Sequence, residues 1–228
     1  LSLAQEDAMV AVVSRTASDL TSLVAEIGGT SAGHYSLSAD LMPEGAPTQV
    51  LDEVSAHFGP LDIVVHNLGG TLGIRDPFCT VEEWRRIWRF NLEIAVEMNR
   101  LIVPAMQARK WGRVVHISSI AAVRGRSSVP YAAVKAALNT YVRGLGCAVA
   151  PDGVIVTAVM PGAILTRDGH WDIVSKDNPE YAQRYLAERI AIRRFGTPEE
   201  ISDFVVFLCS ERSSFFAGAV LPIDGGTW

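Results

Sequence analysis

The segment Tyr131-Ala132-Ala133-Val134-Lys135 decides how this sequence is interpreted, together with the Ser118-Ser119 pair that closes the apolar run before it. Tyr131 and Lys135 are four residues apart, so on a helix they share one face, where a serine hydroxyl from a strand end can meet them. A neighbouring positive charge lowers the pKa of a phenol, which makes tyrosine a usable general acid or base. In most proteins such a pair is merely solvated or packed, so the interpretation depends on the motifs around it.

Six short apolar runs have the character of buried strands, and helical patterns separate them. Near-continuous apolar strands that alternate with helices predict a parallel sheet covered on both faces, an α/β doubly wound fold of three layers. Thr80 and Glu83 form a capping box that opens a helix reaching to about Arg109, and Thr197-Pro198 opens another. The expected strands lie near residues 9–14, 34–38, 62–66, 113–118, 153–159 and 219–223.

The order of motifs resembles the short-chain dehydrogenase/reductase family from about residue 8 to the C-terminus, in particular its 3-oxoacyl reductase and sugar or polyol dehydrogenase branches. The resemblance implies a Rossmann-type fold and an oxidoreductase that transfers a hydride between a nicotinamide cofactor and a carbonyl or secondary alcohol. The matching segments, in family order, are Ser14-Arg15, Ala39-Asp40-Leu41, Asn67-Leu68-Gly69, Asn91, Ile117-Ser118-Ser119, Tyr131-x-x-x-Lys135, Pro161-Gly162-x-Ile164-x-Thr166 and Asp224-Gly225-Gly226.

The same resemblance implies catalytic roles for four side chains, and no metal is required. Ser119 hydrogen-bonds the substrate oxygen, Tyr131 gives or takes its proton, and Lys135 lowers the Tyr131 pKa and binds the nicotinamide ribose. Asn91 holds a water that links Lys135 to solvent, unless it is simply an exposed helix residue. The strand alignment favours Ser119 as the catalytic serine, whereas counting back from Tyr131 favours Ser118 if the 120–130 loop has full length. We expect Ser119.

The adenosine end of the cofactor is expected beside the first two strands. Arg15 follows the strand whose end faces the adenosine ribose, where an acidic residue would bind the 2′-hydroxyl and an arginine suits a 2′-phosphate. The sequence therefore predicts NADP(H) in preference to NAD(H). The alternative is that Arg15 is only a solvated charge at a strand end. Ser14 would add a hydrogen bond in either case. Asp40 and Leu41 lie where the family cradles the adenine, but Asp40 would serve equally as a helix N-cap.

The nicotinamide end is expected where later strands end. Asn67 and Gly69 follow a strand, at the edge where open α/β sheets bind their ligands. Their neighbours His66 and Leu68 depart from the family, which has Asn and Ala at these positions. The remaining expected contacts follow a later strand and resemble those that the family makes to the cofactor: Pro161, Gly162, Ile164 and Thr166. Without the resemblance, the Pro161-Gly162 pair would indicate only a turn.

The start of the chain differs from the family pattern. Leu1 to Asp7 resembles the tail of a helix and Ala8 to Ser14 a buried strand, so the family's first strand and its glycine-rich turn are missing. That strand lies in the middle of the sheet, and without it the neighbouring strands would be about 9–10 Å apart, too far to pair. We therefore expect this sequence to be N-terminally incomplete. The glycine-rich run 28–33 follows a helical stretch and predicts an ordinary turn, not a phosphate-binding loop.

Length and composition predict a single domain spanning residues 1–228, and the resemblance implies that it is a dinucleotide-binding catalytic domain. The net charge is −5 and 49% of the residues are hydrophobic, which argues against a nucleic-acid surface. Cys79, Cys147 and Cys209 stand alone and the histidines show no ligand spacing, so we expect neither disulfides nor a metal site. No apolar run reaches the roughly 18 residues of a membrane span and no signal peptide opens the chain. A cytoplasmic protein that acts on a small molecule, with no membrane or nucleic-acid partner, is the expectation.

Two further expectations concern the surface. Segment 167–197 is rich in charged and aromatic residues and is expected to be a substrate lid, although it does not identify the substrate. Apolar positions on more than one face of 80–109 and 130–150, with the 219–228 terminus, predict a homotetramer or homodimer. The competing interpretation is a nucleotide-binding family member without turnover, in a regulatory or structural role. The complete set of Asn91, Ser119, Tyr131 and Lys135 favours an enzyme, while the missing glycine-rich turn keeps the alternative open.

Overall fold

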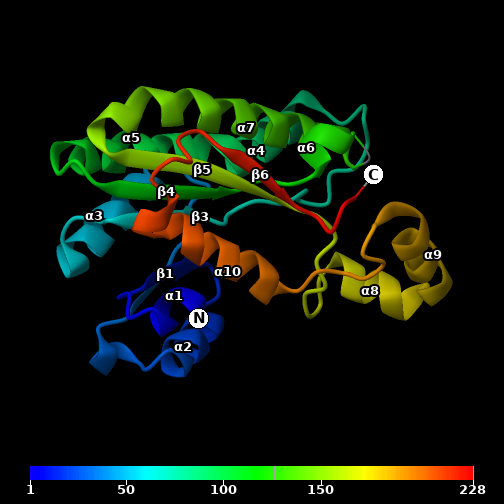
Figure 1. Cartoon of the computed structure of the whole chain (residues 1–228), viewed down its shortest axis with the longest axis horizontal. Helices are drawn as coiled ribbons and strands as arrows, with labels where there is room; N and C mark the ends of the chain where they lie inside the picture. Colours follow the sequence, from blue (N-terminus) through cyan, green and yellow to red (C-terminus); the bar gives the residue numbers. More distant parts are fainter. Residues whose placement is uncertain (126, 228) are drawn as a thin grey trace.

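Two parallel β-sheets form the frame of the molecule (Figure 1). The structure is a computed structural model that describes residues 1–125 and 127–227. One sheet has the strand order β3-β4-β5-β6, and β1 pairs with β2 in the other. Each strand begins and ends within two residues of the range predicted from the sequence, so these predictions are confirmed. The strands are β1 (Ala11–Ser14), β2 (Tyr35–Ser38), β3 (Ile63–His66), β4 (Gly112–Ile117), β5 (Val154–Pro161) and β6 (Val220–Ile223).

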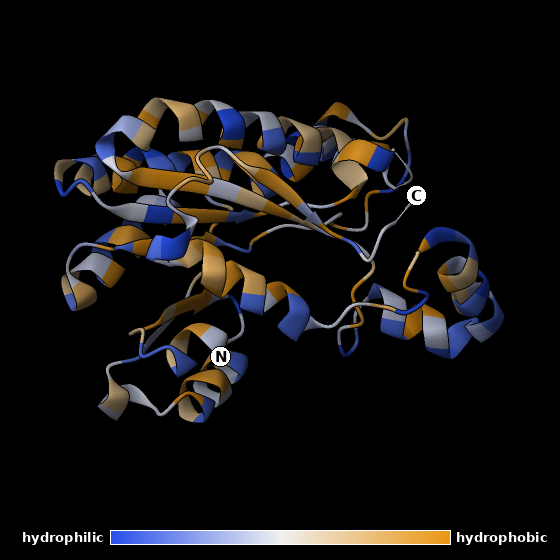
Figure 2. Ribbon diagram, in the orientation of Figure 1, coloured by the Kyte–Doolittle hydropathy of each residue, from blue (hydrophilic) through white to orange (hydrophobic). Residues whose placement is uncertain are grey.

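Helices cover both faces of the four-stranded sheet, as the apolar strands predicted. Helices α3 (Ala46–Phe58), α5 (Ile94–Ala108) and α7 (Val129–Val149) pack on one face, where Val114 and Val156 belong to the core. Helix α10 (Pro198–Cys209) packs on the other face, against Val115 and Val159. Figure 1 shows α5 and α7 on one side of the sheet and α10 on the other, and Figure 2 shows the hydrophobic strands between them. Alternate residues of one strand therefore serve two cores.

The helix predicted from Thr80 to about Arg109 is interrupted by a π-helical turn. Helix α4 (Val81–Trp88) starts with the expected capping box, in which Thr80 and Glu83 bond each other's backbone N–H groups. The turn Arg89–Glu93 follows, and α5 then runs to Ala108. Single π-helical turns inside α-helices occur frequently at functional sites. Periodicity did not predict this interruption, because residues on both sides of it keep helical spacing.

The N-terminal part is a small layer of its own beside the main sheet. Helix α1 (Ser2–Gln5) lies on α10, where Ser2 Oγ donates to Ser202 Oγ at 2.8 Å and Leu3 packs against the second core. Helix α2 (Ala17–Glu26) covers β1 and β2. The glycine-rich run after it forms a turn around a 3₁₀ helix (Thr30–Ala32), as expected. Strands β1 and β3 are not hydrogen-bonded to each other, so each has one edge without a described partner strand.

The segment expected to be a lid forms two helices, α8 (His170–Asp177) and α9 (Pro179–Arg189). Figure 1 shows them as a separate projection beside the end of the sheet. The Trp171 ring packs on Tyr185 at 4.2 Å and on Phe195 at 5.1 Å between ring centres. Shorter elements complete the described chain: α6 (Ala121–Arg124) and the 3₁₀ helices Ala150–Asp152 and Glu211–Ser213.

Candidate active site

Tyr131 and Lys135 lie on the first turns of α7, as the four-residue spacing predicted. Ser128 caps this helix by accepting from the Tyr131 N–H at 3.4 Å, and its hydroxyl donates to the Ile74 carbonyl at 2.7 Å. Lys135 is only 2% exposed. Its Nζ donates to the Ile117 carbonyl at 2.8 Å and lies 5.7 Å from the centre of the Tyr131 ring. The first turns of α7 thus hold a phenol and an amine close together, and the end of β4 supplies the carbonyl that accepts from the amine.

Burial controls the ionisation of both groups. It raises the pKa of Tyr131, and a hydrogen bond with Ser119 offsets part of that increase. Burial also lowers the pKa of Lys135 to about 8. The sequence predicted that Lys135 would lower the pKa of Tyr131; in this structure the net direction is the opposite. Removing a phenolate from water is unfavourable, and here this effect exceeds the stabilisation that the neighbouring groups offer.

The structure separates the two candidate serines. Ser118 is buried, and its hydroxyl donates to Asn139 Oδ1 at 2.6 Å, away from the phenol. Ser119 Oγ accepts from the Ala121 N–H at 3.1 Å and hydrogen-bonds the Tyr131 side chain. Of the pair, Ser119 is therefore the one whose hydroxyl faces the phenol.

Asn91 lies in the π-helical turn and is only 3% exposed, so the alternative of an exposed helix residue is wrong. Its amide nitrogen donates to the carbonyls of Gly70 and Ile87, both at 2.9 Å, and its oxygen accepts from the Gly70 N–H at 2.9 Å. A Cβ on Gly69 would lie 2.8 Å from both Asn91 Oδ1 and Lys135 Nζ. Glycine at this position lets the chain after β3 pass between the two side chains.

The residues expected at the adenosine end lie where β1 and β2 end, and two of the four, Arg15 and Asp40, are exposed. Ser14 Oγ accepts from the Thr16 N–H at 3.4 Å, and the Arg15 carbonyl accepts from Ser38 at 3.3 Å. The Arg15 side chain is exposed. Asp40 is not a helix N-cap, because α3 is capped by Gly45. Its carboxylate accepts from the Met42 N–H at 3.0 Å and closes a turn in which Leu41 is half-buried.

The expected nicotinamide contacts follow β3 and β5. Asn67 is exposed, and Leu68, the bulky replacement, is 37% exposed. The Gly162 N–H donates to the Ile223 carbonyl at 3.0 Å, which joins the loop after Pro161 to β6. Thr166 is exposed, and its carbonyl accepts from Gly169 at 2.9 Å, where the chain turns toward α8.

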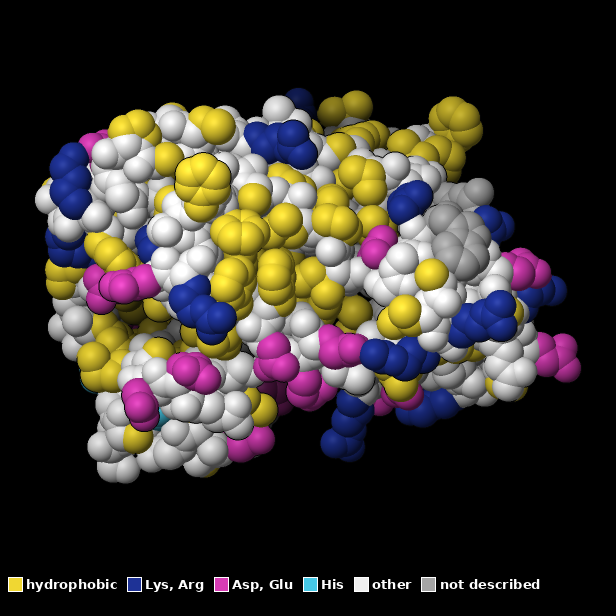
Figure 3. Space-filling view, in the orientation of Figure 1, with side chains coloured by type: hydrophobic (Ala, Val, Ile, Leu, Met, Phe, Trp, Pro, Cys, Tyr) yellow, Lys and Arg dark blue, Asp and Glu magenta, His cyan; other side chains and the backbone are white. Residues whose placement is uncertain are grey.

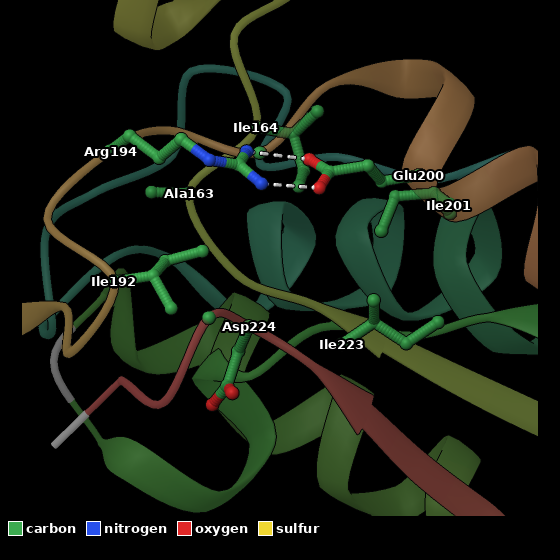
Figure 4. Close-up of a pocket in the computed structure, with 10 residues that line it drawn as sticks. Ala163, Ile164, Ile192, Arg194, Glu200, Ile201, Ile223 and Asp224 are labelled. Atoms are coloured by element: carbon green, nitrogen blue, oxygen red, sulfur yellow. Dashed lines mark hydrogen bonds and ion pairs between the residues drawn. The ribbon is translucent and has the colours of Figure 1, made fainter.

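Ile164 lines a cavity of about 170 Å³ between the end of β5, the start of α10 and the C-terminal loop (Figure 4). Arg194 and Glu200 face each other across it through two hydrogen bonds of 2.9 and 2.6 Å. Arg194 is the main reason that the pKa of Glu200 is lowered to about 2, with a contribution from the Thr197 N–H. Sequence patterns do not predict this pair, because the contact depends on how the chain bends before α10.

A buried polar cluster behind the site was also missed. Asn99 Oδ1 lies 2.7 Å from His66 Nε2, and its nitrogen donates to the Tyr141 hydroxyl at 3.1 Å and lies 3.2 Å from His116 Nε2. The two imidazoles stack at 4.5 Å. Burial lowers the pKa of His66 to about 4 and also lowers that of His116 well below its ordinary value, so both rings are neutral at pH 7. His66 at an unusual position was the available signal, but its partners are distant in sequence.

The described residues offer neither a metal site nor a membrane-spanning helix. Within residues 1–125 and 127–227, no group of three or more His, Cys, Asp or Glu side chains has an arrangement suited to a metal ion. No helix in the same ranges combines the length and apolar character needed to cross a membrane.

Comparison with known proteins gives consistent matches along the chain. Residues 1–227 match the family described as enoyl-(acyl carrier protein) reductase. The chain is 31% identical to the 3-oxoacyl-[acyl-carrier-protein] reductase of Aquifex aeolicus, over 84% of this chain and 75% of the relative. It is also 31% identical to an inactive 2-(S)-hydroxypropyl-CoM dehydrogenase of Xanthobacter autotrophicus, over 96% and 94%. Among solved structures it resembles L-sorbose reductase from Gluconobacter frateurii with NADPH and L-sorbose, with a TM-score of 0.89 and 32% identity over 99% and 89% of the chains.

Proposed function

Because the chain belongs to the short-chain dehydrogenase/reductase family, whose members are NAD(P)-dependent oxidoreductases acting on CH–OH groups, we propose that it reduces a small carbonyl compound with NADPH. The observation that carries this proposal is the meeting of Ser119, Tyr131 and Lys135 at the end of β4, with Asn91 and Gly69 beside them. The sorbose reductase of similar fold was solved with NADPH.

The residues around Lys135 fit a nicotinamide cofactor. An ammonium group has three protons to donate, and among the described residues its one hydrogen-bond acceptor is the Ile117 carbonyl. The remaining protons are available to ribose hydroxyls. Asn67 and Gly69 follow the carboxyl end of β3. The other four expected contacts lie at or after the carboxyl end of β5, on the far side of β4: Pro161, Gly162, Ile164 and Thr166. Open α/β sheets bind their ligands at such ends. When bound, the nicotinamide ring supplies or accepts the hydride.

The proposed chemistry of the side chains follows from their protonation. Ser119 donates a hydrogen bond to the substrate oxygen, and Tyr131 transfers a proton to it. Because burial raises the pKa of Tyr131, the phenol carries its proton at neutral pH. A protonated phenol is the form that can give a proton to the substrate oxygen during carbonyl reduction, whereas alcohol oxidation requires the phenolate. Asn91 holds the turn at Gly70 beside Lys135. In this proposal it also holds the water through which a proton from solvent reaches Lys135.

The preference for NADP(H) rests on Arg15. Its exposed guanidinium follows β1, where a 2′-phosphate would receive charge-assisted hydrogen bonds. Ser14 and the turn at Asp40 lie at the same carboxyl edge of the β1-β2 sheet and are proposed to contact the ribose and the adenine.

Three further parts of the proposal concern architecture. The edges of β1 and β3 that lack a described partner support a further parallel strand with a glycine-rich turn between them. The described residues then form one catalytic domain, in which 167–197 closes over the substrate. A high-resolution structure of the protein isolated from its natural source, with cofactor bound, would contradict this if β1 and β3 remained unpaired and 167–197 did not approach the substrate.

A homotetramer with two-fold axes is also part of the proposal. Trp88, Val96 and Leu101 leave apolar surface exposed on α4 and α5, and Phe215 is fully exposed before β6. Figure 3 shows hydrophobic side chains gathered in the middle of the face in front of β6 and α10. Trp228, which the sequence analysis included in this interface, lies outside the described residues. Light scattering at micromolar concentration checks the assembly, and a monomeric mass would contradict it.

The direct test is turnover by the purified protein. A panel of ketones, 3-oxoacyl thioesters and ketoses should contain a substrate that consumes NADPH, followed by its absorbance. Cofactor binding measured by calorimetry in parallel separates the outcomes. Binding without turnover across the panel and its alcohol counterparts would favour the silent, nucleotide-binding alternative, and absence of binding would contradict both.

A further inference from the structure

Arg89 connects the π-helical turn to a loop far away in sequence. Its Nε donates to the Met42 carbonyl at 2.8 Å, and its Nη2 donates to the Pro43 carbonyl at 3.1 Å. On the other side, Nη1 donates to Glu97 at 3.2 Å, with Glu93 at 3.9 Å. Only 18% of the side chain is exposed. One guanidinium therefore holds two consecutive backbone carbonyls while two carboxylates balance its charge.

The loop that Arg89 holds, residues 39–45, lies at a ligand-binding edge. It follows the carboxyl end of β2, and the Ala39 N–H still donates to the Ser14 carbonyl at 2.9 Å, so the loop leaves beside β1. Within it, the Asp40 carboxylate closes a turn on the Met42 N–H. Ligands of open parallel sheets bind outside the carboxyl ends of the strands.

Apart from the Ala39 backbone bond to β1, few hydrogen bonds fix this loop from outside. Among the residues that the structure describes, Arg89 is the only side chain from another element that hydrogen-bonds to residues 39–45. Gly45, which ends the loop, has a left-handed conformation and provides no side-chain cap to α3. One distant guanidinium therefore supplies all the side-chain hydrogen bonds that other described elements make to this loop.

The same π-helical turn also reaches the candidate catalytic centre. Asn91, two residues after Arg89, clamps Gly70 through hydrogen bonds of 2.9 Å in both directions. We propose that Arg89 is a positioning residue for the cofactor: it holds loop 39–45 against the turn that carries Asn91 and so presents Asp40 to the adenosine half of the dinucleotide. This inference rests on the proposed function, and it adds a residue that touches neither substrate nor cofactor.

The chemistry of the contact requires arginine. The planar guanidinium offers donors in fixed directions, which suits two neighbouring carbonyls and a carboxylate at once, whereas a lysine ammonium is a single point of charge. Without Arg89 the two carbonyls hydrogen-bond to water instead, and the loop samples more conformations. Binding of the adenosine half must then order the loop, which lowers the affinity for that half and leaves the affinity for the nicotinamide half unchanged.

The experiment measures the two halves of the cofactor separately by calorimetry. Arg89→Ala should weaken adenosine 2′,5′-bisphosphate and NADPH by roughly tenfold each, since hydrogen bonds of a charged donor are lost, and leave reduced nicotinamide mononucleotide unchanged. AMP and NADH replace the adenosine probes if the protein prefers NADH. Arg89→Lys should fall between the wild type and Arg89→Ala.

Arg85→Ala is the matched control. Arg85 lies one turn earlier on the same helix, in an ion pair of 3.6 Å with Glu82 whose side chains are about three-quarters exposed, so its removal should change none of the affinities. If Arg89→Ala does not melt cooperatively, Arg89→Lys carries the test and must show the selective loss. Equal losses for both halves, or no loss, in a protein that binds NADPH would overturn the inference alone. A wild type that binds neither dinucleotide would overturn the proposed function and this inference with it.

Discussion

The two ends of the proposed cofactor site are built in opposite ways. At the catalytic end, Lys135 and Asn91 are buried, and backbone groups hold them at 2.8–2.9 Å. At the adenosine end, Arg15 and Asp40 are exposed, and the loop between β2 and α3 depends on Arg89. The difference indicates that burial sets the chemistry at one end, whereas surface charge and loop order set recognition at the other.

The largest effect is expected at the catalytic end. Tyr131→Phe keeps the packed ring and removes the hydroxyl group with its transferable proton, so turnover should fall by about 10²- to 10⁴-fold while NADPH affinity stays within a few fold. Steady-state kinetics and calorimetry on the same preparation measure the two quantities. Retention of more than about a tenth of the activity would show that Tyr131 is not the proton donor.

At the adenosine end the expected effect is a change of preference. The wild type should prefer NADPH over NADH by roughly 10- to 100-fold in kcat/KM, because a guanidinium–phosphate bond is worth about 1.5–3 kcal/mol. Arg15→Asp should reverse the order, and in the wild type the preference should shrink with added salt, since Arg15 is exposed. If the ratio of kcat/KM for NADPH to that for NADH is unchanged in Arg15→Asp, Arg15 is only a solvated charge and does not bind the 2′-phosphate.

Gly69→Ala tests how tightly the catalytic end is packed. The new Cβ would lie 2.8 Å from Lys135 Nζ and Asn91 Oδ1, and both side chains must move, so we expect a loss of about tenfold in kcat/KM. Gly144→Ala is the control: on α7 its Cβ would meet nothing within 4 Å, and alanine there should stabilise the helix by about 0.5–1 kcal/mol. Similar kinetics for the two variants would mean that the catalytic end tolerates displacement.

The smallest expected effect is in the pH profile. Burial lowers the pKa of Lys135 to about 8, so the folded protein loses this proton as the pH rises through 8. The ammonium form is the one that donates to ribose hydroxyls, and kcat/KM for NADPH should therefore be constant below pH 7 and fall to about half near pH 8. A profile that stays level to pH 9.5 would contradict the assignment of this limb to Lys135.

The sequence predicted most of what is local. Strand positions follow from apolar runs, the capping box at Thr80 follows from a side chain three residues away, and Thr197-Pro198 marks the start of α10. The order of motifs also identified Tyr131, Lys135 and Ser119, because each lies at a strand end or on a helix turn whose direction the fold class dictates. Ser119 was preferred over Ser118 on alignment, and the contact with Tyr131 supports that choice.

What the sequence did not determine depends on groups that are distant along the chain. The raised pKa of Tyr131 comes from the packing around the phenol, and the role of Asp40 as a turn, not an N-cap, depends on where α3 begins. Arg89 reaches carbonyls 46 and 47 residues away, and the cluster of His66, Asn99 and His116 joins two strands and a helix. Periodicity and capping are interactions between near neighbours, so the sequence encodes them directly. Desolvation and long-range hydrogen bonds arise only when the whole chain has packed, and they decide the ionisation and the geometry of this site.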